Sequence, residues 1–204
     1  MLKVDISKGV FELDQDIESE RMKKKSNDGL IFNLGLTDIL RLTMFGTLVT
    51  IVNDITRLPL HMPGHTSLWW MGLLVLGKGL IPKKGAGIIM GIVSGVLAVF
   101  LGLGSEGVLV FFKYFIPGLV LDIIAPLFYN KLESPIIGAI CGALASVAKM
   151  IVNLLLGLAM NLPMVFLTLG LGVTAVSHVI FGAIGGVIAT SLIKRLKPRL
   201  LNWD

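Results

Sequence analysis

The chain has 204 residues, of which 54% are hydrophobic and only 15% are charged, and its mean hydropathy is +0.86. Soluble domains are about a quarter charged, so this composition excludes a disordered chain and argues against a soluble enzyme or a nucleic-acid-binding protein, despite the net charge of +5. With one cysteine, Cys141, the chain can form neither an internal disulfide nor a cysteine-based metal cluster.

Residues 1–30 are the polar part of the chain, and we expect them to form a cytosolic tail. They lack the long apolar core of a signal peptide, so nothing predicts their cleavage. Their basic run, Lys23 to Lys25, either faces anionic lipid headgroups or is an ordinary solvated charge run.

Residues 31–204 are predicted to form one all-α membrane domain. Apolar stretches alternate there with short polar breaks, and a helix of about 20 apolar residues crosses a bilayer. We therefore expect a bundle of six transmembrane helices, which in chain order cover residues 36–56, 67–81, 85–103, 108–129, 135–160 and 165–193.

Basic residues fall on one side of this expected bundle. Lys83, Lys84 and Lys131 lie in connections on that side, and the basic run at 194–199 follows the last helix, whereas Arg57 is the only basic residue in the connections on the other side. Because cytoplasmic loops are enriched in Lys and Arg, this asymmetry predicts that both termini are cytoplasmic.

Small residues recur at four-residue spacing in three of the expected helices. Residues four apart share one helix face, so these stripes predict close approach of helix backbones. The stripes are Gly87, Gly91 and Gly95; Gly138, Gly142 and Ser146; and Gly182, Gly186 and Thr190.

A few ionisable residues fall inside the expected helices, where charge is costly and marks a functional site by default. They are Lys113, Asp122, Lys149 and His178. With the predicted orientation, Lys113, Lys149 and His178 lie toward the outside of the membrane, together with Asn153 and Asp54, and we expect a substrate-binding pocket open to the exterior.

Structural alternatives stay open for each of these residues. Lys149 can pair with Asp122, His178 can hydrogen-bond a helix carbonyl, and Lys113 can extend to the membrane interface. For Lys149 we favour the pocket, because a buried lysine is expensive unless something uses it.

The first outward connection, residues 57–66, holds the candidate metal ligands His61 and His65, for which a metal site is a minority hypothesis. Just after it, Trp69 and Trp70 either stack on a planar ligand or belong to the aromatic belt at the membrane interface. Adjacent helical residues point in different directions, so at least one of the two is expected in the belt.

Enzymatic signatures are few. There is no phosphate-binding loop, so we expect the chain not to hydrolyse ATP itself. Ser105, with His178 and the small residues Gly182 and Gly186 that follow it, superficially resembles a rhomboid-type intramembrane serine protease. The usual sequence around the serine and an oxyanion hole are both missing.

Two segments carry a family resemblance: residues 177–189, followed by the basic residues 194–197, and residues 113–122. Together with six short helices, cytosolic ends and a long first external loop, they resemble a substrate-binding (S) component of an energy-coupling-factor (ECF) ABC transporter. The resemblance covers about residues 30–199.

The resemblance implies a capture subunit in the prokaryotic cytoplasmic membrane. Such a subunit binds a vitamin or cofactor precursor from outside, holds no cofactor itself, and works with a transmembrane coupling protein and two cytosolic ATPase subunits that use ATP. Small residues on the first helix contact the coupling protein in this family. The matching positions here are Thr43 and Thr47, or Gly46 and Thr50, which depart from the usual alanine pair.

The expected substrate is an organic molecule with an acidic group. The cations Lys113, Lys149 and His178 favour a carboxylate or phosphate, and Trp69, Tyr114 and Phe115 offer stacking surface. A metal ion or metal chelate is the alternative substrate within the family.

Overall fold

The computed structural model describes residues 34–56, 65–104, 106–128, 131–161 and 164–201, without the side chains of residues 65, 164–174 and 199–201. All of them belong to one unit of the chain, Leu34–Asp204. The expected cytosolic tail, with Lys23 to Lys25, lies outside the described residues, and so do His61 and Ser105.

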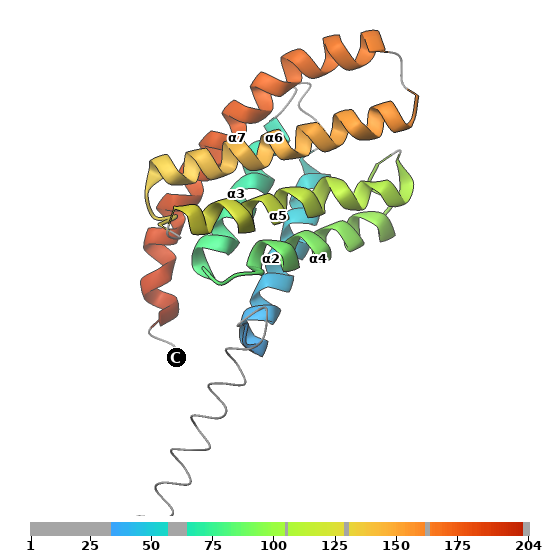
Figure 1. Cartoon of the computed structure of the whole chain (residues 1–204). Helices are drawn as coiled ribbons and strands as arrows, with labels where there is room; N and C mark the ends of the chain where they lie inside the picture. Colours follow the sequence, from blue (N-terminus) through green and yellow to red (C-terminus); the bar gives the residue numbers. More distant parts are fainter. Residues whose placement is uncertain (1–33, 57–64, 105, 129–130, 162–163, 202–204) are drawn as a thin grey trace, which may run out of the picture. The chain divides into compact units, whose positions relative to one another are not determined.

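The described part of the chain is all-helical. It forms six α-helices and one short 3-10 helix, η1 (Gly107–Leu109), which runs directly into α5 (Figure 1). The α-helices are α2 (Leu36–Ile55), α3 (His65–Leu80), α4 (Ala86–Phe100), α5 (Val110–Leu127), α6 (Pro135–Ala159) and α7 (Met164–Leu201).

The six helices coincide with the six apolar stretches, with one correction. The basic run at 194–199 was expected to follow the last helix, but α7 has 38 residues and continues to Leu201. Lys and Arg are good helix formers, and no glycine follows Gly186 to end the helix. The apolar boundary at Ile193 therefore marks a change in composition within α7 and not the end of the helix.

Four helical segments are long and apolar enough to cross a membrane, which fits a multi-pass membrane protein. They are Leu36–Ile55, Gly107–Leu127, Pro135–Ala159 and Ala175–Pro198. Helices α3 and α4 have 16 and 15 residues, shorter than the length that a full span requires.

Helices α4, α5 and α6 lie side by side in that order, and α7 packs along α6 (Figure 1). The small-residue stripes make these contacts, as predicted. A Cβ added to Gly142 would collide with the backbone of Gly182, and one added to Gly87 would collide with the backbone of Gly118. These small residues are therefore buried in helix contacts within the chain.

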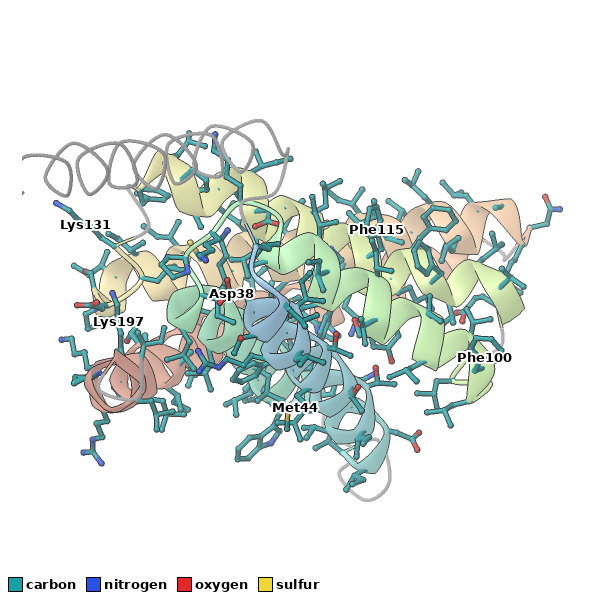
Figure 2. The ribbon with its side chains drawn as sticks, turned by 90° about the horizontal axis from the view of Figure 1, so that it is seen from below. Asp38, Met44, Phe100, Phe115, Lys131 and Lys197 are labelled. Carbon is teal, nitrogen blue, oxygen red and sulfur yellow. The ribbon has the colours of Figure 1, made fainter. Side chains whose placement is uncertain are left out.

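The helix directions define two ends of the bundle. At one, which we call the basic end, α3 and α5 finish and α4 and α6 begin, and it carries Lys83, Lys131 and Lys197. Figure 2 shows Lys131 and Lys197 at this end and Phe100, the last residue of α4, at the opposite end. Ion pairs tie the basic end together, since Lys83 pairs with Asp38 at 2.6 Å and Lys197 with Glu133 at 2.6 Å.

Candidate functional site

Two groups of buried polar residues lie toward opposite ends of the bundle. The first, at the basic end, is built on Lys78 of α3 and Asp122 of α5. The Lys78 Nζ donates to Asp122 Oδ1 at 2.5 Å, and the two side chains are 0% and 6% exposed. Nζ also donates to the Lys83 carbonyl at 2.7 Å, and Asp122 Oδ2 accepts the backbone N–H of Ile88 at 2.7 Å.

This first group corrects two expectations. Asp122 pairs with Lys78 and not with Lys149, so the structural alternative for Lys149 is wrong. The buried charges were also expected to gather toward the end opposite the basic one, but Lys78 and Asp122 lie at the basic end. Lys78 was not singled out from the sequence. The missing signal was its spacing: Lys78 follows Trp70 by eight residues and Leu74 by four, so it shares their inward face.

The second group lies toward the opposite end, around Trp70. Its side chain is fully buried, the Lys149 Nζ lies 3.7 Å from the centroid of its ring, and the Tyr114 ring lies beside it with centroids 5.9 Å apart. The Tyr114 hydroxyl accepts a hydrogen bond from the Asn53 amide, which is itself buried. We call Asn53, Trp70, Tyr114, Lys149 and Asn153 the Trp70 cluster.

Four helices contribute to the Trp70 cluster, each from the half that lies away from the basic end. Asn53 is near the end of α2, Trp70 near the start of α3 and Tyr114 near the start of α5. Lys149 and Asn153 are one turn apart in the second half of α6, on one face as the spacing predicted. The cluster thus joins parts of the chain that are far apart in sequence.

Two polar atoms of the cluster are buried without a hydrogen-bond partner among the described residues. They are the indole nitrogen Nε1 of Trp70 and the side-chain oxygen Oδ1 of Asn153. Buried polar groups are paired in the great majority of cases, because an unmade hydrogen bond leaves the cost of desolvation uncompensated. The indole is a donor only and the amide oxygen an acceptor only, so the cluster leaves one unused hydrogen-bonding atom of each kind.

A buried serine pair lies next to the cluster, between α3 and α6. The Ser67 and Ser146 hydroxyls are 3.0 Å apart, in buried positions on α3 and α6. Ser146 is the last member of its small-residue stripe, and a Cβ on Gly182 of α7 would collide with it. Helices α3, α6 and α7 therefore approach closely at Ser146, three residues before Lys149.

The other predicted binding residues are placed elsewhere or differently. Trp69 is 55% exposed while Trp70 is buried, so the two tryptophans do point in different directions. Lys113 pairs with Glu106, and both side chains are largely buried. Asp54 is exposed, and His178 is partly buried on α7 and makes contacts of its own. The buried tryptophan of the cluster is thus Trp70, and stacking of a ligand on Trp69 stays a prediction.

The predicted metal ligands receive no support from the described residues, among which no group of three or more His, Cys, Asp or Glu side chains is arranged to hold a metal ion. His65 begins α3, and its side chain lies outside the description.

The proposed coupling positions on α2 split into two pairs. Gly46 and Thr50 face α4, where Gly46 packs against Met90 and Val93 and the Thr50 hydroxyl donates to the Ser94 carbonyl at 3.1 Å. This pair is covered within the chain and is not open to a partner. 

Thr43 and Thr47 are half-buried, and their hydroxyls donate to carbonyls of their own helix. The exposed face of α2 carries large apolar side chains, of which Met44, at 73% exposure, is labelled in Figure 2.

Comparison with models of known protein families, with curated proteins and with solved structures finds no match to this chain.

Proposed function

We propose that this chain is a membrane-embedded solute-binding subunit of the ECF S-component kind, and that the Trp70 cluster holds an organic micronutrient for ATP-driven uptake. The observation that supports this proposal is the cluster itself. A lysine ammonium, a fully buried tryptophan and two unpaired polar atoms lie together inside the helix bundle. Polar groups in such surroundings are costly and are kept where they serve a ligand or a pathway.

We further propose that all six helices cross a prokaryotic cytoplasmic membrane with both termini inside, so that the basic end faces the cytosol. Lys83, Lys131 and the Lys and Arg residues of the last turns of α7 are then on the side where Lys and Arg are enriched. The Trp70 cluster lies toward the outside, where a scarce solute is captured.

The exposed side of α2 is the proposed contact with the coupling protein. It combines half-buried Thr43 and Thr47 with exposed Met44 and Leu48, so that a partner helix can approach closely at the threonines and pack against the neighbouring apolar side chains. ATP is used by the partner ATPases and not by this chain.

The test is co-purification with an ECF module of one coupling protein and two ATPases, co-expressed with the full chain. We expect a stable complex that Thr47→Trp breaks. The matched control is Ile151→Trp, an equally bulky change at a lipid-exposed position of α6 that is 51% exposed. Failure of the wild-type chain to associate with any such module would contradict the proposed function.

A further inference from the structure

The Trp70 cluster presents two hydrogen-bond donors side by side. The Lys149 ammonium lies 3.7 Å from the centroid of the Trp70 ring, and the unpartnered Nε1–H belongs to that same ring system. The ammonium lies over the face of the ring and the Nε1–H points outward from its edge, so a group with two acceptor atoms is needed to meet both donors. Two adjacent donors, one of them charged, match the two oxygens of a carboxylate, whereas a phosphate offers more oxygens than this pair can serve.

The unpaired acceptor of the cluster belongs to the next residue along the same face of α6. Asn153 follows Lys149 by one helical turn on the same face of α6, a rise of about 6 Å. Its Oδ1 atom is buried without a partner, and an amide oxygen can only accept a hydrogen bond. A molecule that satisfies both ends therefore needs an N–H or O–H group as well as a carboxylate, and the backbone spacing suggests about one helical turn between them.

The cluster also has two adjacent aromatic rings. The Trp70 and Tyr114 rings lie 5.9 Å apart at an angle of 52°, and the Tyr114 hydroxyl is engaged by the Asn53 amide. Aromatic faces favour a flat or apolar body over a hydrated polar one.

We propose that the cluster is a binding site for a small carboxylic acid that carries an N–H or O–H donor about one helical turn from its carboxylate. The carboxylate bridges Lys149 Nζ and Trp70 Nε1, and the donor bonds to Asn153 Oδ1. This inference rests on the proposed function for its physiological meaning, but binding itself is measured without any partner protein.

The test uses equilibrium dialysis of the purified, detergent-solubilised full chain with three probes. 4-Aminobenzoate has a carboxylate and an amine separated by a distance close to the helical spacing, benzoate lacks the donor, and 4-aminobenzamide lacks the charge. We expect 4-aminobenzoate to bind at least about tenfold tighter than either analogue, which corresponds to about 1.4 kcal/mol.

Variants assign each end of the probe. Lys149→Met should remove the preference for 4-aminobenzoate over 4-aminobenzamide, and Lys149→Arg should restore part of it. Asn153→Leu should remove only the preference over benzoate. Thermal unfolding of each variant identifies any that fail to fold. If Lys149→Met does not fold, the role of the cation is tested with Lys149→Arg, which should keep part of the preference for the carboxylate; loss of that preference in a folded Lys149→Arg protein would contradict the inference.

Equal binding of the three probes, or no binding of any, would overturn the inference. So would a Lys149→Met protein that folds and still prefers the carboxylate. Association with an ECF module is measured separately. If the chain associates with the module but does not bind the probes, only this inference is contradicted. If the chain prefers 4-aminobenzoate but associates with no module, only the proposed function is contradicted.

Discussion

Lys78 and Asp122 form an ion pair inside the helix bundle, with a 2.5 Å contact between Nζ and Oδ1 and side chains that are 0% and 6% exposed. The same carboxylate accepts the backbone N–H of Ile88 in the first turn of α4, where helices leave their N–H groups unpaired. The pair therefore joins α3, α4 and α5 at the basic end, with one oxygen of Asp122 for each of two neighbours.

Removing one partner of this pair should be strongly destabilising. Asp122→Leu leaves the Lys78 ammonium buried without its counter-charge, and breaking a buried pair in this way costs about 3–5 kcal/mol. The measurement is the free energy of unfolding in mixed detergent micelles. The double variant Lys78→Met with Asp122→Leu should recover most of the loss, since both charges are then absent; a double variant as unstable as the single one would contradict this account.

Glycine at position 142 should be irreplaceable for packing. Gly142→Ala places a methyl group against the Gly182 carbonyl, where neither backbone can move without separating α6 from α7. Overpacking of this kind costs about 1–3 kcal/mol. The control is Gly35→Ala, whose added Cβ would meet only the Asp38 side chain at 3.6 Å, an ordinary contact. Equal thermal midpoints for the two variants would show that the α6–α7 contact is looser than the structure has it.

Helix positions and helix packing were predictable from the sequence, and partner choice within the bundle was not. Apolar stretches and four-residue spacing act locally, so α6 and the Gly142 stripe follow from them directly. The pairing of Asp122 depends on which end of the bundle each residue occupies. Asp122 lies near the end of α5 and Lys149 in the second half of α6, and these helices are antiparallel, so the two residues are directed to opposite ends.

Only part of the Trp70 cluster was predictable, because spacing within one helix can be read from the sequence and side-chain contacts between helices cannot. Lys149 and Asn153 follow from spacing within one helix. Trp70 was not separated from Trp69, because the choice between two adjacent residues depends on how α3 is rotated against its neighbours. The inward series Ser67, Trp70 and Leu74 carried that information at helical spacing.

The ion pair between Glu133 and Lys197 predicts a pH effect at Glu133, which lies outside the candidate membrane-spanning segments. The hydrogen bond from Lys197 holds the pKa of Glu133 below its ordinary value of 4.5. A depressed carboxylate pKa stabilises the fold above the unfolded-state pKa, and this contribution is lost as the pH falls through the folded-state pKa. Because Glu133 is about half exposed, the effect is small and weakens with salt.

The measurement is a comparison of wild type with Glu133→Gln by thermal unfolding at several pH values. The wild-type advantage should be present at neutral pH and disappear below pH 4.5. Lys197→Met should remove the same advantage, and an advantage that grows as the pH falls would contradict the assignment.

The short helix α4 gives the sharpest test of the six-span topology. With 15 residues it is about 22 Å long, less than the roughly 30 Å of a bilayer core, and it is not among the four candidate spans. If α4 nevertheless crosses, Lys84 before it and Leu101 after it lie on opposite sides of the membrane. Both positions are exposed, and Cys141, the chain's one cysteine, is fully buried.

Single cysteines at these positions can therefore be labelled against a silent background. In intact cells, a membrane-impermeant maleimide should label Leu101→Cys, and it should label Lys84→Cys only after permeabilisation, because the basic end is predicted to face the cytosol. Wild type, with buried Cys141 alone, should stay unlabelled in both conditions. Labelling of both variants from outside would mean that α4 does not span the membrane and that the bilayer is crossed by fewer than six helices; the reverse pattern would invert the orientation and place the Trp70 cluster on the cytosolic side.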